Sequence, residues 1–188
     1  MKSHLSTGLA TITVVIGISA IGVMAYTQGY RGNVDNTYPA GLYRLNYQPT
    51  EHFHGELVLF CPPVDTLLQE ALEQDIISDG FCQGGVEPFV QQIIAMPGDR
   101  VDIRSDKVFV NNQEVPLTHP LTTPYEAKDA SFTLQLNQFF MIADHHSSNN
   151  MDSREFGSVQ NNHIIASLEP VWILWGEHSP HEDVSEDE

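Results

Sequence analysis

The sequence predicts a mostly β protein with small α-helical insertions, which follows one hydrophobic N-terminal segment. Short runs rich in Val, Ile, Leu, Phe and Tyr alternate with Pro, Gly and Asp turn signals, as is typical of antiparallel strands. One amphipathic stretch, at residues 64–78, breaks this pattern. Hydrophobic residues are 41% of the 188 residues and charged residues 18%, which is a globular composition. We therefore expect one folded domain of roughly 150 residues.

The N-terminal segment is apolar and long. Residues 8–26 carry no charge, and at about 1.5 Å of rise per residue they nearly cross a hydrocarbon core of about 30 Å. A cleaved secretory signal is the alternative, but its apolar region is usually about 7 to 15 residues long. Lys2 precedes the segment and the acidic bulk follows it, so we expect a cytoplasmic N-terminus and an exported domain. The expected organisation is a membrane anchor at 1–27, a folded domain at 28–176 and a disordered acidic tail at 177–188.

The elements that follow the anchor are predicted in order along the chain. Residues 28–36 are polar and are expected to form a tether. Strands are expected at residues 41–45, 57–60, 89–96, 100–103, 107–110, 139–143 and 171–175. Residues 102–111 read as a hairpin with its bend at 104–106. Apolar residues recur near the 3.6-residue period over 64–78, which predicts a helix there.

Charge and cysteine content exclude some classes of protein. A formal net charge of -17, with only 8 Lys and Arg, argues against nucleic-acid binding, because phosphate contacts need a basic surface. Cys61 and Cys82 are the two cysteines, and in an exported domain they are compatible with one disulfide around the predicted helix. A pair of unlinked buried thiols is the alternative. Neither cysteine has a second ligand at the short spacing of structural zinc sites.

The histidines raise the question of a metal site. His52 and His54 alternate, which in a strand would put both on one face, and Asp144, His145 and His146 could add ligands from another segment. We expect instead loop histidines exposed to solvent, with no metal and no cofactor. Their expected consequence is pH sensitivity, because 9 histidines would offset part of the negative charge below about pH 6.

Six short segments occur in a fixed order after the apolar segment. They are Thr-Tyr-Pro-Ala-Gly-Leu-Tyr at 37–43, Val-Leu-Phe-Cys-Pro-Pro at 58–63, Gly-Phe-Cys-Gln-Gly-Gly at 80–85, Ile-Ala-Met-Pro-Gly-Asp at 94–99, Val-Asn-Asn at 110–112 and Asp-Ser-Arg-Glu-Phe-Gly at 152–157. Together they resemble the boxes of the signal peptidase I family, and most closely its conjugative-transfer branch, the TraF-like pilin-processing peptidases. The resemblance implies a serine-type endopeptidase fold of antiparallel strands. It also implies a periplasmic domain behind a single anchor in the bacterial inner membrane.

The resemblance assigns three positions to the chemistry, and two of them are substituted. Thr37 stands where the family has its nucleophilic Ser, and Gln91 stands where it has the Lys that acts as general base. Threonine keeps a hydroxyl, but threonine peptidases use a free N-terminal amine as base, and Thr37 is internal. The amide of Gln91 cannot accept a proton near neutral pH. Asp152 stands at the supporting acid, although an ion pair with Arg154 or a turn cap also accounts for it.

The remaining box residues would line the cleft or shape it. By resemblance they are Tyr38, Pro39, Gly41, Pro97, Gly98, Asp99, Ser153 and Arg154. We expect the hydroxyl of Ser153 to be structural. No lysine is placed to replace the base, because Lys2 precedes the apolar segment, Lys107 belongs to the predicted hairpin and Lys128 lies in a polar connection.

These observations predict a catalytically degenerate relative that keeps its cleft as a binding surface. Its expected partners are a pilin or another component of the conjugative secretion machinery, and a sister peptidase could supply the missing activity. The alternative is an active endopeptidase that processes or cyclises pilin, in which Thr37 attacks and a base comes from elsewhere in the fold or from a partner. A purely structural periplasmic protein is a third interpretation.

Overall fold

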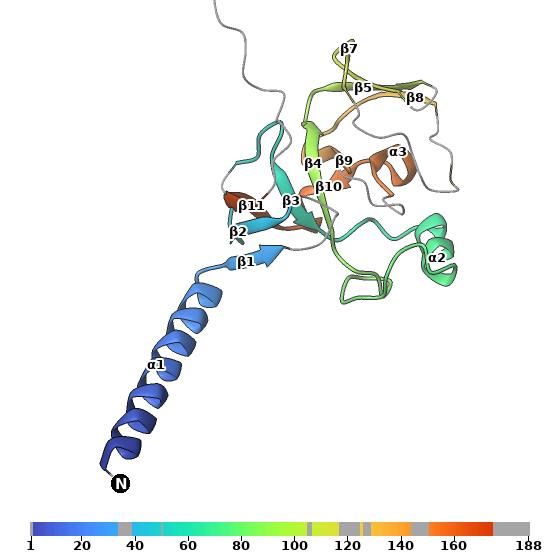
Figure 1. The fold of residues 1–188 in the computed structure, drawn as a ribbon. Helices are drawn as coiled ribbons and strands as arrows, with labels where there is room; N and C mark the ends of the chain where they lie inside the picture. The colour runs from blue at the N-terminus through green and yellow to red at the C-terminus, as the bar shows by residue number, and fades with distance from the viewer. Residues whose placement is uncertain are drawn as a thin grey trace, which may run out of the picture.

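A computed structural model describes residues 2–33, 39–49, 51–104, 107–116, 125, 129–143 and 151–174, with the backbone alone for residues 2–11. Within these residues, two antiparallel sheets and three short helical segments follow one long N-terminal helix (Figure 1). The predicted class, mostly antiparallel β with few helices, is therefore confirmed.

The long helix α1 (Lys2–Thr27) projects from the β domain and leads directly into the first strand (Figure 1). Arg31 braces this junction, because its guanidinium lies 3.7 Å from the centre of the Tyr26 ring and donates to the Tyr26 and Tyr30 carbonyls at 2.8 Å. Among the residues described with side chains, no helix is both long and apolar enough to cross a membrane. The predicted membrane span is therefore not confirmed.

A seven-stranded sheet forms the larger part of the domain. Its order is β1-β2-β11-β3-β4-β9-β10, and every neighbouring pair is antiparallel. The strands are β1 (Tyr30–Asn33), β2 (Gly41–Asn46), β3 (Leu57–Phe60), β4 (Phe89–Ala95), β9 (Gln138–Ile142), β10 (Val159–Gln160) and β11 (Ile164–Ile173). The C-terminal strand β11 thus lies between two strands from the first third of the chain. The core on this sheet is built from Val58, Phe60, Ile93, Phe139, Met141 and Val159.

A second, four-stranded sheet continues from the end of β4 and lies at one end of the molecule (Figure 1). Its order is β7-β6-β5-β8, with strands β5 (Arg100–Arg104), β6 (Lys107–Val110), β7 (Gln113–Glu114) and β8 (Ala130–Thr133). Val101, Ile103 and Val108 point from one face into a core that includes Phe140 and Ile142 of β9. Successive side chains alternate across a strand, so the other face carries Asp102, Arg104 and Phe109, with the Arg104 guanidinium over the Phe109 ring. The predicted hairpin is the β5–β6 pair, and part of its expected bend lies outside the described residues.

The predicted helix is present but shorter than expected. Helix α2 spans Thr66–Glu73 and begins where the Asp65 carboxylate accepts a hydrogen bond from the Leu68 amide at 2.8 Å. It ends because Asp75 adopts a positive φ of 56°, which the right-handed helix does not allow. Ile76, the last apolar residue of the predicted pattern, lies beyond the helix end, and it packs with Ile77 into the same small core as α2.

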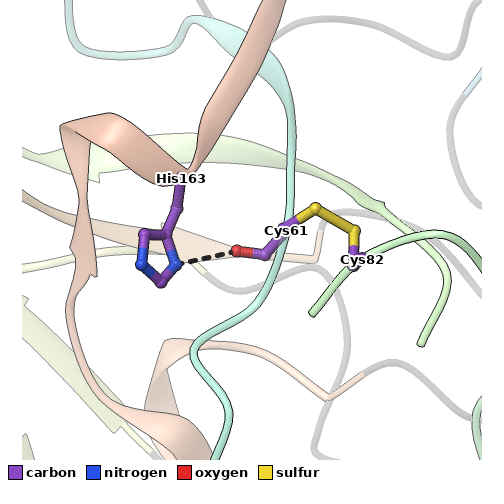
Figure 2. Close-up of a disulfide and its surroundings, with 3 residues drawn as sticks. All are labelled: Cys61, Cys82 and His163. Atoms are coloured by element: carbon purple, nitrogen blue, oxygen red, sulfur yellow. Dashed lines mark hydrogen bonds between the residues drawn. A yellow bond between two sulfur atoms is a disulfide. The ribbon is translucent and has the colours of Figure 1, made fainter. Parts of the chain in front are cut away.

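The two cysteines form one disulfide, as the even count predicted (Figure 2). Cys61 directly follows β3, and the bond to Cys82 closes the segment that contains α2. His163 holds the same point from the other side, because its Nδ1 lies 3.1 Å from the Cys61 carbonyl oxygen and its own carbonyl accepts from the Cys61 amide at 2.9 Å (Figure 2). Both ends of the segment that contains α2 are thus held at the end of β3.

Four short strands were not predicted, and residues 28–36 are not simply a tether. The unpredicted strands are β1, β7, β8 and β10, each of which lies at the edge of its sheet. Strand β11 was also predicted too short, because Glu169 and Pro170 interrupt its apolar pattern. The register shifts between Pro170 and Trp172, and proline within a sheet is tolerated at such an irregularity.

Removal of the disulfide should destabilise the domain without changing its fold. In the chain-entropy model, a closed loop with a sequence separation of 21 is worth about 3 kcal/mol of unfolding free energy. We expect Cys61→Ala combined with Cys82→Ala to lose this amount in urea denaturation followed by circular dichroism. A reductant should reproduce the loss in the unaltered protein and have no effect on the double variant. Equal stability of the two proteins would contradict the assignment.

Candidate functional site

Gln91, at the position of the family's general base, lies in a central strand of the larger sheet. Strand β4 runs between β3 and β9, and its residues 91, 93 and 95 are all buried. Gln91 stands opposite Val58 of β3, so the two side chains leave the sheet on the same face. Only 3% of Gln91 is exposed. A polar side chain in this place must find its hydrogen bonds within the protein.

The Gln91 amide finds one hydrogen bond and leaves one atom without a partner. Its Nε2 donates to the Met151 carbonyl oxygen at 2.6 Å. Because a carbonyl oxygen only accepts, this contact determines which end of the amide faces Met151. Its Oε1 is buried and has no hydrogen-bond partner among the described residues. The site thus presents a neutral amide oxygen at the position where the resemblance implies a basic amine.

Met151 leads directly into the Asp-Ser-Arg box, which forms a capped turn. Helix α3 (Ser153–Phe156) begins at Asp152, whose carboxylate accepts from the Arg154 amide at 2.9 Å. The Glu155 carboxylate accepts in return from the Asp152 amide at 2.8 Å, which completes a capping box. The turn cap expected for Asp152 is therefore present.

The side chains of the same box tie it to strand β9. Asp152 and Arg154 form a buried ion pair, with 2.6 Å between Oδ2 and Nη2. The hydroxyl of Ser153 accepts from the Met141 amide at 3.0 Å, and Asp152 accepts from the Ala143 amide at 3.4 Å. Ser153 therefore has the structural role that the sequence predicted. The expected ion pair is also present.

The Pro-Gly-Asp box makes the connection between the two sheets. Gly98 has a φ of 94°, a conformation that favours glycine, and its amide donates to the Leu134 carbonyl at 2.9 Å. The Asp99 carboxylate accepts from the Met96 amide at 2.8 Å and from the Asn111 side chain at 2.8 Å. Burial of the Asp99 carboxyl raises its pKa, but these hydrogen bonds and the contact with His54 outweigh burial and lower the pKa below its ordinary value.

The first box is only partly described. Thr37 and Tyr38 lie outside the described residues. Pro39 is held by the Tyr43 hydroxyl, which donates to its carbonyl at 2.6 Å. A Cβ at Gly41 would collide with the Trp172 carbonyl oxygen of β11, so only glycine allows this close pairing.

Gln91 therefore contacts the carbonyl of the residue directly before Asp152, while the roles assigned to the two positions remain a prediction. Within the described residues, no lysine or histidine contacts the Gln91 amide. Lys107 lies in the smaller sheet, where it pairs with Glu114 at 2.7 Å, and the side chains of Lys2 and Lys128 are outside the described residues.

The structure also corrects the interpretation of two histidines. Residues 51–56 form a loop, as expected, and the His54 side chain is exposed, but the His52 side chain is not. His52 is buried and lies 2.7 Å from the carboxylate of the buried Glu56, while His54 lies 2.7 Å from Asp99. The described residues contain no group of three residues that could hold a metal ion. Nothing in the sequence pattern distinguished a histidine paired with a carboxylate from an exposed one.

The fold and these boxes indicate a signal peptidase-like protein, and comparison with known protein families agrees. Residues 3–173 match the family described as signal peptidase, peptidase S26. The chain belongs to this family.

Relatives within the family identify the branch. The chain is 31% identical over 175 residues to a plasmid transfer protein TraF of Escherichia coli, covering 89% of this chain and 96% of the relative. It is 31% identical over 161 residues to a conjugal transfer protein TraF of Agrobacterium tumefaciens, covering 84% of this chain and 90% of the relative. A crystal structure of a signal peptidase I from Enterococcus faecalis superposes with a TM-score of 0.40 at 14% identity, over 65% of this chain and 100% of that one. The sequence matches place the chain in the TraF-like branch.

Asp152→Asn should destabilise the protein strongly, because it leaves Arg154 buried without its counter-charge. Asparagine preserves the N-cap, so the loss isolates the charge, and about 3 to 5 kcal/mol is expected for a broken buried pair. Urea denaturation gives the value. The matched control is Lys107→Gln, which breaks the exposed pair with Glu114 and should lose less than about 1 kcal/mol. Similar losses in the two variants would contradict the structural role of the buried pair.

Gln91→Lys should make stability depend on pH. Burial disfavours the ammonium form, so the lysine pKa in the folded protein should fall below its unfolded value of about 10.4. The unfolded state then binds more protons, and the variant should gain stability as the pH rises from about 6 to about 10, by about 1.4 kcal/mol per unit of pKa shift. Gln91→Met, which has a similar length and no charge, is the control. Parallel pH profiles of the two variants in urea denaturation would show that position 91 admits water.

Proposed function

We propose that this protein is a membrane-anchored, TraF-like component of conjugative transfer that binds a pilin or another assembly component without cleaving it. The observation that carries the proposal is the Gln91 amide, which is buried, neutral and bonded to Met151 at 2.6 Å. It occupies the position at which the family has its general base. The Asp152–Arg154 pair, which follows the Met151 carbonyl that this amide contacts, is present.

The chemical reason for proposing degeneracy is the loss of the base. A hydroxyl nucleophile at Thr37 needs a nearby group that accepts its proton, and an amide does not do so near neutral pH. Loss of a general base typically slows a reaction by about 10² to 10⁴. The β-branched side chain at Thr37 is also stiffer at χ1 than serine. The framework can hold a peptide segment without this chemistry, since binding needs shape and hydrogen bonds but no proton acceptor.

The proposed setting comes from the named relatives. Proteins called plasmid transfer and conjugal transfer protein TraF match this chain over most of their own length. We infer a single-pass anchor in the bacterial inner membrane, with the N-terminus in the cytoplasm and the folded domain in the periplasm. The disulfide between Cys61 and Cys82 supports an oxidising compartment. A sister peptidase would perform the cleavage that this chain does not.

The second candidate function is an active endopeptidase that processes or cyclises pilin with Thr37 as nucleophile. The observation that favours it is that the Asp152–Arg154 pair, at the supporting acid position, directly follows Met151, whose carbonyl contacts Gln91. This function requires a base that is supplied by a partner or by residues outside the described ranges.

Mass spectrometry of the candidate pilin distinguishes the two functions. The pilin would be incubated with the full-length protein, with Thr37→Ala and with Thr37→Ser combined with Gln91→Lys. We expect no cleavage by the first two proteins and measurable cleavage by the double variant, because serine and lysine restore the family's nucleophile and base. Pilin binding should be retained in Thr37→Ala.

Two results would count against the proposal. Cleavage by the full-length protein that disappears in Thr37→Ala would establish the active endopeptidase. Absence of pilin binding by every variant, with folding confirmed by circular dichroism, would leave the purely structural interpretation.

A further inference from the structure

The loop at residues 51–56 makes hydrogen bonds both to β4, the strand that carries Gln91, and to Asp99 beside the second sheet. On one side it continues the β3–β4 ladder, because the Gly55 amide donates to the Ile93 carbonyl at 2.7 Å and the Ile93 amide donates to the Glu56 carbonyl at 2.9 Å. The Gln92 side chain adds a bond from Nε2 to the Gly55 carbonyl at 3.0 Å. The loop therefore lies directly beside β4, next to the candidate site.

Inside the loop, His52 and Glu56 form a buried pair. His52 Nδ1 lies 2.7 Å from Glu56 Oε2, and the two side chains are 8% and 5% exposed. The same carboxylate oxygen accepts from the Phe53 amide at 3.3 Å. The His52 ring meets the Phe139 ring edge-on, with 5.0 Å between their centres. The pair thus links the start of the loop to its end.

Across the loop, His54 reaches the other sheet. Its Nε2 lies 2.7 Å from Oδ2 of Asp99, which directly precedes β5. Asp99 is also bonded to residues that directly follow strands of the second sheet. Its backbone carbonyl accepts from the Leu134 amide at 2.9 Å, and its carboxylate accepts from the Asn111 side chain. His54 thus connects the segment before β3 with the residue directly before β5 of the other sheet.

We propose that the loop at residues 51–56 is a clasp between the two sheets, which tightens as the pH falls through the range in which histidine takes up a proton. A protonated histidine facing an ionised carboxylate makes a charge-assisted hydrogen bond, which is stronger than the bond from a neutral ring. Both bonds of the clasp have this form. The device adds pH control to the strand beside the site and does not depend on whether the protein cleaves a substrate.

The direction of the response follows from the groups that face each histidine. Among the described residues, Glu56 is the charged group in contact with His52, and Asp99 is the one in contact with His54. Arg100 is turned away, toward Asp102 and Ser131. The lowered pKa of Asp99 keeps this carboxylate ionised at mildly acidic pH. The clasp should therefore be tighter on the acidic side of neutral pH, where a histidine can carry a charge, than on the alkaline side, where it is neutral.

Amide hydrogen exchange on the full-length protein tests the clasp at the bonds that it holds. Protection factors, which already correct for the effect of pH on intrinsic exchange, would be compared at about pH 5.5 and about pH 8. The amides of Gly98 and Leu134 report on the junction between the sheets. We expect them to be about two- to fivefold better protected at the lower pH, a small factor because His54 is 56% exposed and exposed pairs are weak.

Variants assign the response to its source. His54→Gln keeps a side-chain donor that cannot be charged, so protection at Gly98 and Leu134 should no longer change with pH. His163→Gln is the matched control, because His163 faces a backbone carbonyl and no carboxylate, and it should behave like the unaltered protein. A pH response that persists in His54→Gln would overturn the proposal. Equal protection of these amides at the two pH values in the unaltered protein would also overturn it. This second result does not depend on the folding of any variant.

Discussion

Asp152 and Arg154 form an ion pair that is almost fully removed from solvent, and neither charge is stable there without the other. The pair closes the turn that follows Met151, and the Ser153 hydroxyl fastens the same turn to the Met141 amide of β9. Met151 in turn supplies the carbonyl that receives the Gln91 amide. The geometry of the candidate site therefore depends on a buried charge pair.

Glutamine at position 91 can keep the local structure without providing a titratable group. A lysine in this place would have to be kept neutral by burial to act as a base, and this would place a strained titratable group in the core. Glutamine is uncharged at every physiological pH and satisfies the Met151 carbonyl with the same kind of N–H donor. The fold can thus be retained when the base is lost. The Gln91 Oε1 acceptor is buried and has no hydrogen-bond partner among the described residues.

Most of the fold was predictable because the central strands carry their own signal. Strands β2, β3, β4, β5, β6 and β9 are apolar runs bounded by turns, and each was expected within a few residues. The strands that were not expected, β1, β7, β8 and β10, are all at sheet edges. An edge strand bonds to one neighbour only, so it needs little apolar surface, and Tyr30–Asn33 has almost none. Its place is determined by the strand beside it.

The sequence by itself determined the family, the cysteine pair, the boxes of the site and the substitutions at Thr37 and Gln91, because each of these is a matter of residue type and order. Only the tertiary structure decided what surrounds those residues. It buried Gln91 against Met151, and it turned His52 and His54 toward carboxylates of different segments. The physical reason is that burial and pairing arise from contacts between segments far apart in the chain. His54 and Asp99 are separated by 45 residues, and no local pattern records such a contact.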